Sequence, residues 1–257
     1  MAAGVIATLA RQIDAGPCVI AAWCCLPDPG VAELLAREGF DTAVLDMQHG
    51  TFDLAATLAA IGSVALAGKP AMVRLAVGDF AMASRLLDGG AAAVIAPMIN
   101  SAADAATFAS FCKYPPAGDR SWGPGRGIAL TGLGASDYLA QANGQQLAIA
   151  LIETRAALGA LDDILAVPGI DGVYVGPSDL SIALSNGAHV DPFHAEVDAA
   201  LTHIVARSKA HGKFAGLFTF SGASAKAMAA RGFAICSIAT DQMLLRQAAK
   251  AELAAAR

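Results

Sequence analysis

Eight short apolar runs recur along this chain of 257 residues and alternate with alanine-rich stretches of helical character. The runs are residues 18–23, 42–46, 71–75, 92–96, 147–152, 172–175, 214–218 and 234–238. They are continuously apolar, so we expect strands buried on both faces, as in a parallel sheet covered by helices. Eight such strands predict an α/β fold, a (β/α)8 TIM barrel filling residues 1–257 as one domain. A doubly wound sheet is the alternative, but it gives no reason for the runs to stop at eight.

The chain is 56% hydrophobic and 15% charged, which raises the question of a membrane span. A spanning helix needs about 20 apolar residues. The longest candidate, residues 54–68, is interrupted by glycine and ends at Lys69 and Pro70. The apolar stretch 4–10 follows no basic segment and is not expected to be a signal peptide. We therefore expect no membrane association.

Charge and cysteine content exclude further classes. The net charge is −5 and no basic stripe is present, so nucleic acid is not an expected partner. The cysteines are odd in number and show no C-x-x-C spacing, which predicts neither a disulfide framework nor a zinc site. A reducing cytoplasm is the expected compartment. The cysteines, which we interpret as small buried hydrophobic residues, are Cys18, Cys24, Cys25, Cys112 and Cys236.

Polar and aromatic residues stand where the predicted strands end. In a (β/α)8 barrel the carboxyl ends of the strands and the loops after them form the active-site mouth. The strands carry little other charge, so these side chains are expected to converge at one mouth. They are Trp23, Asp46, His49, Arg74, Glu153 and Asp179.

Glu153 and Asp179 follow neighbouring strands. Two converging carboxylates either repel each other or share a cation, and a divalent ion such as Mg²⁺ or Mn²⁺ would leave coordination positions open for a chelating substrate. The alternative is that one or both cap a helix, because Asp179 lies in the sequence Gly-Pro-Ser-Asp. The spacing leaves both interpretations open.

The other polar residues also allow two interpretations. Arg74 can stabilise a developing enolate oxygen or form a salt bridge in the mouth. His49 stands three residues after Asp46, so the two can form a general base, or His49 can simply hydrogen-bond within a loop. The lysines precede strands or fall on helices, which disfavours a Schiff-base mechanism.

The turn at Gly176, Ser178 and Asp179 opens a predicted helix. Free N–H groups at a helix N-terminus bind anions such as carboxylates. A carboxylate site beside a metal suggests a 2-oxo acid as ligand. By contrast, residues 123–127 do not satisfy G-x-G-x-x-G and are interpreted as a pliable loop. They belong to a Gly/Pro-rich irregular stretch, residues 114–136.

Several motifs resemble the class II pyruvate aldolases of the HpcH/HpaI type, in the phosphoenolpyruvate/pyruvate-type barrel superfamily. The resemblance spans almost the whole chain. Its motifs include Leu-Asp-Met-Gln-His at 45–49, Val-Arg at 73–74, Ile-Glu-Thr at 152–154 and Val-Gly-Pro-Ser-Asp-Leu-Ser at 175–181.

The resemblance implies a metal-dependent aldolase that reversibly adds a pyruvate-type enolate to an aldehyde and cleaves 4-hydroxy-2-oxo acids. It implies that Glu153 and Asp179 bind a divalent metal, Mg²⁺ or Mn²⁺ with Co²⁺ as a further option. Arg74 would bind the keto or enolate oxygen, and His49 with Asp46 would form the base. Trp23, Gly176, Ser178 and Asp179 would line the substrate site.

Some residues depart from the family pattern. Gln48 removes a charge beside the predicted base, and the loop 121–126 carries an unusual indole and proline. The aldehyde acceptor therefore stays open, as does the choice between a pyruvate and a hydroxypyruvate donor. Two further hypotheses are a decarboxylase of oxaloacetate or another β-keto acid, and a non-catalytic barrel that binds keto acids.

Residues 242–256 place apolar side chains at helical spacing, including Leu244, Leu245 and Ala248. Such a face can pack on its own barrel or on a neighbouring subunit. The family resemblance implies the second arrangement, a swapped C-terminal helix in a homohexamer built as a trimer of dimers.

Overall fold

The computed structural model describes residues 4–257. Eight parallel strands pair in chain order and close into a barrel, β1-β2-β3-β4-β5-β6-β7-β8, so the predicted (β/α)8 architecture is confirmed. The strands are β1 (Val19–Cys24), β2 (Thr42–Asp46), β3 (Ala71–Arg74), β4 (Ala93–Ala96), β5 (Leu147–Ile152), β6 (Gly172–Val175), β7 (Phe214–Thr219) and β8 (Ile235–Thr240). Each of these strands lies within two residues of the run predicted for it.

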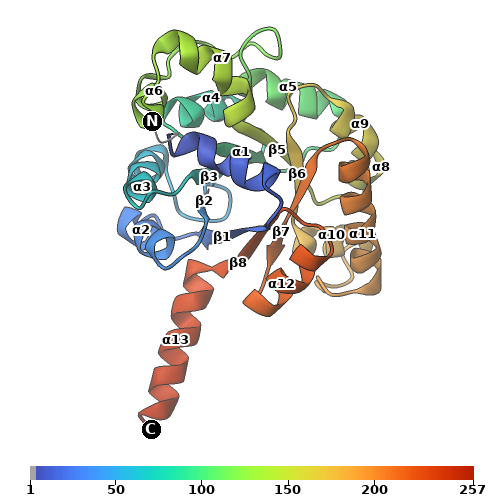
Figure 1. Ribbon diagram of the computed structural model, residues 1–257. Coiled ribbons are helices and arrows are strands. Elements are labelled where there is room, and N and C mark those ends of the chain that lie inside the picture. Colours follow the sequence, from blue (N-terminus) through green and yellow to red (C-terminus); the bar gives the residue numbers. More distant parts are fainter. Residues whose placement is uncertain (1–3) are drawn as a thin grey trace.

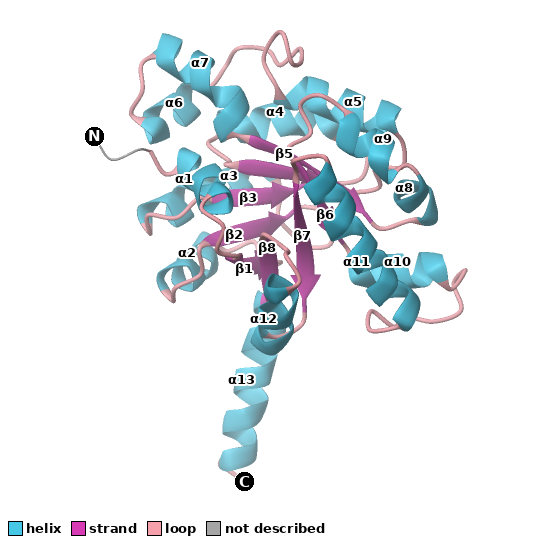
Figure 2. Ribbon diagram, turned by 45° about the vertical axis from the view of Figure 1, so that its right-hand side comes forward, coloured by secondary structure: helices cyan, strands magenta, loops and turns pink. Residues whose placement is uncertain are grey.

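Helices precede, connect and follow the strands, forming the ring around the barrel (Figure 1). The first half contains α1 (Ile6–Asp14), α2 (Pro29–Arg37), α3 (Leu54–Leu66), α4 (Phe80–Asp88), α5 (Ala102–Cys112), α6 (Gly125–Thr131) and α7 (Ala135–Gln145). The second half contains α8 (Arg155–Gly159), α9 (Leu161–Ala166), α10 (Pro177–Leu184), α11 (Ala195–Ala210), α12 (Gly222–Ala230) and α13 (Asp241–Ala255). Figure 2 shows the helices outside the strands. Within residues 4–257, no helix is long and apolar enough to cross a membrane.

Many helices that follow strands begin at a short polar residue whose side chain accepts a hydrogen bond from the first turn. Such caps satisfy backbone N–H groups that lack partners within the helix. They explain why the chain turns from strand to helix at these points. The capping residues are Asp28, Asp53, Ser101, Thr154, Ser221 and Thr240.

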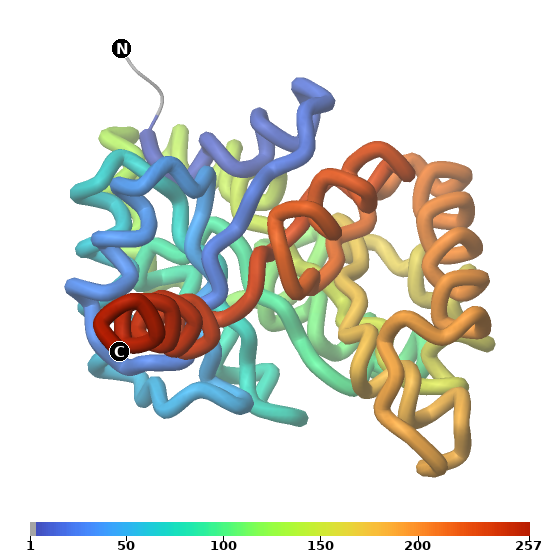
Figure 3. The backbone as a smooth tube through the Cα atoms, turned by 90° about the horizontal axis from the view of Figure 1, so that it is seen from below, coloured from blue at the N-terminus to red at the C-terminus, as the bar shows by residue number. Residues whose placement is uncertain are grey.

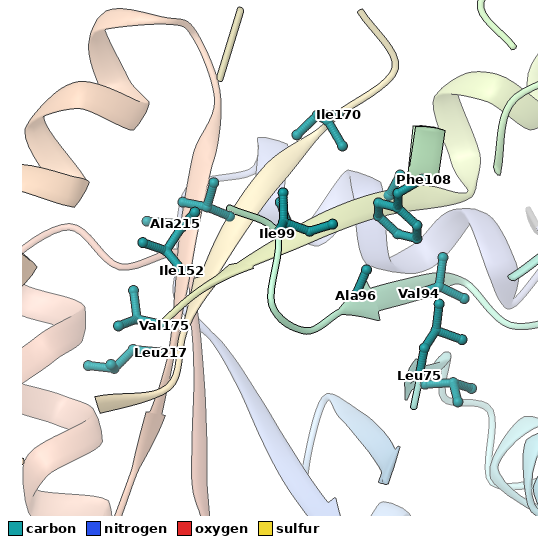
Figure 4. Packing of buried hydrophobic residues seen from close by; sticks show 14 of the residues in the cluster. Leu75, Val94, Ala96, Ile99, Phe108, Ile152, Ile170, Val175, Ala215 and Leu217 are labelled. Atoms are coloured by element: carbon teal, nitrogen blue, oxygen red, sulfur yellow. The ribbon is translucent and has the colours of Figure 1, made fainter. Parts of the chain in front are cut away.

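The barrel wall separates two apolar cores. The outer core lies between strands and helices, and Figure 4 shows Leu75, Val94 and Phe108 among its members. The inner core fills the barrel with alternate strand residues such as Val44 and Met72. It also includes Ile6 and Leu9 of α1. Because both faces of each strand are buried, the strands read as continuous apolar runs.

The Gly/Pro-rich stretch 114–136 is more ordered than predicted. Residues 125–131 form α6, and α7 begins at Ala135, so the interpretation of 123–127 as a pliable loop is wrong for its second half. Tertiary packing explains the difference. Ile128 of α6 packs against a cluster of Tyr114, Tyr138 and Ala142, and the small Gly127 lets the Tyr138 hydroxyl approach closely, since a Cβ there would lie 3.0 Å from it.

The helix α13 leaves the barrel as an arm (Figure 1), seen nearly end-on in Figure 3. Only its first residue, Asp241, is buried. The Asp241 carboxylate accepts hydrogen bonds from the backbone N–H groups of Cys25 and Leu26 at 3.0 and 2.9 Å. Leu245 and Leu253 are 55% and 54% exposed. The apolar face of the arm therefore does not pack on its own barrel.

Candidate active site

A cavity of about 230 Å³ opens at the carboxyl ends of the strands. We call it the mouth cavity. Its walls contain most of the residues that the sequence singled out, namely Trp23, Asp46, His49, Arg74, Gly176, Ser178 and Asp179. They also contain residues that the sequence reasoning missed, namely Cys25, Leu151, Tyr174, Phe218 and Thr240.

Strand parity explains why these side chains meet. Trp23, Tyr174 and Leu151 belong to the inner core, and strand residues two apart share a face. Asp46 and Arg74 lie opposite each other as register partners in the β2–β3 pair. Counting by twos along each predicted strand would have found Tyr174 and Phe218 as well.

Asp46 and Arg74 form the polar centre of the mouth. Arg74 Nε and Nη2 donate to Asp46 Oδ1 and Oδ2 at 2.9 and 2.5 Å. Trp23 Nε1 donates to Asp46 Oδ2 at 3.1 Å, and the Arg74 guanidinium lies 4.9 Å from the centroid of the Trp23 ring. Asp46 is fully buried. Burial raises its pKa, but the hydrogen bonds and charge of Arg74, with Trp23 and Gln48, outweigh that effect and hold the pKa below its ordinary value.

His49 contacts Asp46 through its backbone rather than its ring. The N–H groups of Gln48 and His49 donate to Asp46 Oδ1 at 3.0 and 3.2 Å. Within the part of the chain that the structure describes, the imidazole of His49 makes no hydrogen bond, and His49 is an exposed residue in the wall of the mouth cavity. Asp46 therefore holds the loop that carries His49, while the ring itself is available to a ligand.

Glu153 directly follows β5 and is only 2% exposed. Its Oε1 accepts a hydrogen bond from the backbone N–H of Met98 at 2.9 Å. Met98 has a positive φ of 57°, an uncommon conformation outside glycine. Burial raises the pKa of Glu153, and the charge of Asp179 raises it further against the opposing effects of Met98 and Arg74. Met98 was not predicted, because its contribution is a backbone group.

Gly176 brings Glu153 and Asp179 to one place. A Cβ on this residue would lie 3.0 Å from Glu153 Oε2 and 3.8 Å from Asp179 Oδ2. Among residues 4–257, neither of these two oxygens accepts a hydrogen bond. One oxygen from each carboxylate thus lies within 4 Å of the same point, the Cβ position of Gly176.

Gly176 is also the N-cap of α10, which begins at Pro177 as predicted. The first N–H groups of a helix have no partner within it. Ser178 and Asp179 belong to this first turn and line the mouth cavity. The first-turn residues Ser178 and Asp179 therefore belong to the wall of the mouth cavity, whereas Glu153 is buried and is not part of that wall.

All five cysteines are free. The Cys25 thiol lies in the mouth, where burial first, then Asp46 and Asp241, raise its pKa to about 12. It is therefore a neutral thiol at ordinary pH. None of the lysines lines the mouth cavity, and Lys113 instead pairs with Asp171 at 2.6 Å.

A closed parallel barrel with paired acidic residues at its carboxyl-terminal mouth defines a (β/α)8-barrel enzyme. The profile of the HpcH/HpaI aldolase/citrate lyase family matches residues 20–248. The chain belongs to this family, and it is a class II aldolase, a carbon–carbon lyase.

Two relatives and one solved structure illustrate the relationship. A hydroxypyruvate/pyruvate aldolase of Rhizorhabdus wittichii is 42% identical over 238 residues, covering 93% of this chain and 94% of the relative. A 4-hydroxy-2-oxo-heptane-1,7-dioate aldolase of Salmonella dublin is 34% identical, covering 93% and 90%. The crystal structure of an HpcH/HpaI aldolase/citrate lyase family protein from Burkholderia cenocepacia superposes with a TM-score of 0.86 at 28% identity, covering 97% and 98%.

Proposed function

We propose that this aldolase joins the enolate of pyruvate or hydroxypyruvate to an aldehyde at the mouth cavity, and cleaves 4-hydroxy-2-oxo acids in reverse. The observation that carries the proposal is that carboxylate oxygens of Glu153 and Asp179 both lie within 4 Å of the Cβ position of Gly176, at a helix N-terminus that shares the mouth cavity with Arg74. The donor follows the names of the related hydroxypyruvate/pyruvate aldolases.

The carboxylate pair fits a divalent cation. Glu153 Oε2 and Asp179 Oδ2 both lie within 4 Å of the Cβ position of Gly176, and burial first, then the charge of Asp179, raise the pKa of Glu153. Oxygen donors suit Mg²⁺ or Mn²⁺, with Co²⁺ as a further option, and two protein ligands leave positions for a chelating substrate. When bound, the cation would polarise the keto group of the substrate.

The amides of Ser178 and Asp179 are proposed to hold the substrate carboxylate. A helix N-terminus carries partial positive charge and free N–H donors. Substitution of Gly176 would place a Cβ against Glu153 Oε2. We propose that glycine is required here to keep the approach to both carboxylates open.

Arg74 is proposed to stabilise the enolate oxygen. Its Nε and Nη2 are committed to Asp46, which leaves Nη1 without a hydrogen bond among the described residues. Arg74 is 8% exposed as a residue and its guanidinium packs on Trp23, so it is fixed before substrate arrives. A preorganised donor costs little reorganisation as charge develops.

His49 is proposed to accept the proton from the donor methyl group, and in cleavage from the 4-hydroxyl. His49 lines the mouth cavity, and its ring has no hydrogen-bond partner within the described chain. Asp46 completes this unit by holding the backbone N–H of His49 at 3.2 Å. The absence of a lysine from the mouth supports enolate rather than Schiff-base chemistry.

Exchange of the pyruvate methyl protons for deuterium tests the donor half of the reaction without any aldehyde. We expect exchange with Mn²⁺ and its loss after EDTA treatment, with no covalent adduct on borohydride treatment. Glu153→Gln and Asp179→Asn should abolish both the exchange and the rise in Tm that Mn²⁺ produces. Full exchange in exhaustively chelated protein would overturn the proposal.

We also propose a homohexamer, a trimer of dimers, in which α13 packs on the barrel of a neighbouring subunit. The support is the arm itself, whose exposed Leu245 and Leu253 find no cover on their own barrel. Exposed apolar faces of this kind mark interaction surfaces.

A further inference from the structure

A row of aromatic rings runs from the mouth to the surface. Trp23 and Phe218 pack edge to face with centroids 5.3 Å apart, and Phe218 and Phe220 do the same at 5.3 Å. Phe220 then contacts Phe193, 5.6 Å away. Trp23 is buried, Phe218 and Phe220 are half-buried, and Phe193 is 73% exposed. The row therefore joins the reacting centre to solvent along one apolar path.

A second cavity of about 150 Å³ lies along this row. It shares Pro177 and Phe218 with the mouth cavity. We call it the side groove. Its remaining apolar wall comes from segments that are distant in sequence, namely Pro192, Phe193, Leu201, Leu217, Phe220 and Met228. The shared residues place the side groove directly beside the mouth cavity.

The side groove offers no free charge. Its acidic residue, Asp198, is paired with Arg231 at 2.5 Å. In the mouth cavity, the guanidinium of Arg74 is already bound to Asp46. Along the lining of both cavities, no lysine or second arginine is present to pair with a carboxylate on the far end of a substrate.

Phe193 is held in place although it is exposed. Asp191 N donates to Ser181 Oγ of α10 at 3.0 Å, and Phe193 N donates to Asp191 Oδ1 at 3.0 Å. Ser181 is buried. The loop that carries Phe193 is thereby tied to the helix that begins at the mouth, which fixes the outer end of the groove.

We propose that the side groove is the subsite for the substituent of the acceptor aldehyde, and that this substituent is apolar and uncharged. The inference rests on the proposed aldol reaction at the mouth cavity. Pockets for whole small molecules usually measure about 300–1,000 Å³, so a groove of about 150 Å³ suits part of a ligand. Its position beside the mouth cavity, with Pro177 and Phe218 in both walls, points to the chain or ring behind the aldehyde carbon as that part.

The test compares kcat/KM for pyruvate addition to a series of straight-chain aldehydes, from acetaldehyde to pentanal, with succinic semialdehyde as the charged probe. Burying one methylene is expected to raise kcat/KM about threefold. The ratio of pentanal to acetaldehyde should therefore exceed about tenfold in the wild type, and succinic semialdehyde should fall below pentanal. A flat series, or a preference for the semialdehyde, would overturn the inference.

Variants of the side groove test whether the preference for longer aldehydes arises there. Phe193→Ala and Phe220→Ala should each lower the pentanal to acetaldehyde ratio about fivefold or more, whereas Phe111→Ala, on α5 and outside both cavities, should keep the wild-type ratio. Because Phe193 is exposed, its removal leaves the fold intact. Phe220→Leu retains apolar contact and should restore most of the ratio.

Two controls separate the possible failures. Deuterium exchange of the pyruvate methyl group uses no acceptor. If exchange occurs but kcat/KM does not vary along the aldehyde series, only the inference about the side groove is wrong. If exchange does not occur, the proposed reaction itself is wrong. Sedimentation velocity tests whether a second copy of the chain, rather than a substrate, occupies the side groove. A change of oligomeric state in Phe193→Ala, with the ratio unchanged, would show that a second copy of the chain fills the groove.

Discussion

Asp46 and Arg74 face each other across the β2–β3 pair and are joined by two hydrogen bonds of 2.9 and 2.5 Å. Both side chains are buried. The Asp46 carboxylate therefore accepts hydrogen bonds from the guanidinium, from Trp23 and from two backbone N–H groups. In the site that results, Asp46 acts as the fixed support of both Arg74 and the loop of His49.

Arg74→Lys should lower kcat/KM for aldol cleavage by about 100-fold or more. A lysine supplies one point charge and cannot keep two parallel bonds to Asp46 while pointing a third donor at the substrate. The measurement is steady-state cleavage of a 4-hydroxy-2-oxo acid. Arg85→Lys, at an exposed position on α4, is the matched control. If kcat/KM of Arg74→Lys stays within threefold of the wild type, Arg74 does not stabilise the enolate oxygen as proposed.

Asp46→Asn tests the linkage between charge and stability. The pKa of Asp46 is below its ordinary value in the folded protein, so its ionised form stabilises the fold above about pH 4, the unfolded pKa. That contribution is lost as pH falls through the depressed folded pKa.

We therefore expect Asp46→Asn to cost about 3 kcal/mol of unfolding free energy at pH 7. The difference from wild type should shrink as the pH is lowered below 4. Urea unfolding at several pH values measures this. The exposed Asp119→Asn should show no such trend, and a difference that stays constant with pH would contradict the expectation.

Glu153→Gln should stabilise the metal-free protein while removing its response to metal. Burial and the charge of Asp179 raise the pKa of Glu153, so its ionised form is unfavourable in the fold. Each kcal/mol added to the free energy of unfolding raises Tm by about 2–4 °C in a chain of this size. Differential scanning calorimetry with and without Mn²⁺ measures both effects. Glu38→Gln, at the surface, should leave both unchanged; a lower Tm for metal-free Glu153→Gln would argue against this reading.

His49→Ala should lower deuterium exchange and aldol cleavage by about 100-fold or more, the usual contribution of a general base. Oxaloacetate provides the contrast, because its decarboxylation forms an enolate without proton abstraction from carbon. Pyruvate release from oxaloacetate that persists in His49→Ala, with aldol cleavage lost, would favour a decarboxylase. His203→Ala, at an exposed position of α11, serves as the control.

Leu245→Asp with Leu253→Asp should reduce the oligomer to smaller species without unfolding the barrel. Both leucines are exposed on the arm, so charge there disturbs a subunit contact and not the core. Sedimentation equilibrium gives the mass. Leu66→Asp, at a position of α3 that is 76% exposed, should keep the wild-type mass. An unchanged mass in the double variant would exclude the arm from assembly.

The amino-acid sequence determined the barrel and the residues at the rim of its mouth. Strands buried on both faces must be apolar along their whole length, so residues 42–46 and 147–152 were identified to the residue. Charged residues at the carboxyl ends of such strands are expected to lie at the mouth of the barrel. For that reason Asp46, Arg74 and Glu153 were found without any knowledge of contacts.

The tertiary structure alone decided how those residues are paired. The carboxylate of Asp46 lies near Arg74 in space through strand register, although His49 is nearer in sequence. It also decided that α6 forms in a Gly/Pro-rich stretch, because Ile128 packs against Tyr138 and its neighbours. The row from Trp23 to Phe193 joins three distant segments. Such contacts depend on the closure of the barrel, whereas strand formation depends on local pattern and burial.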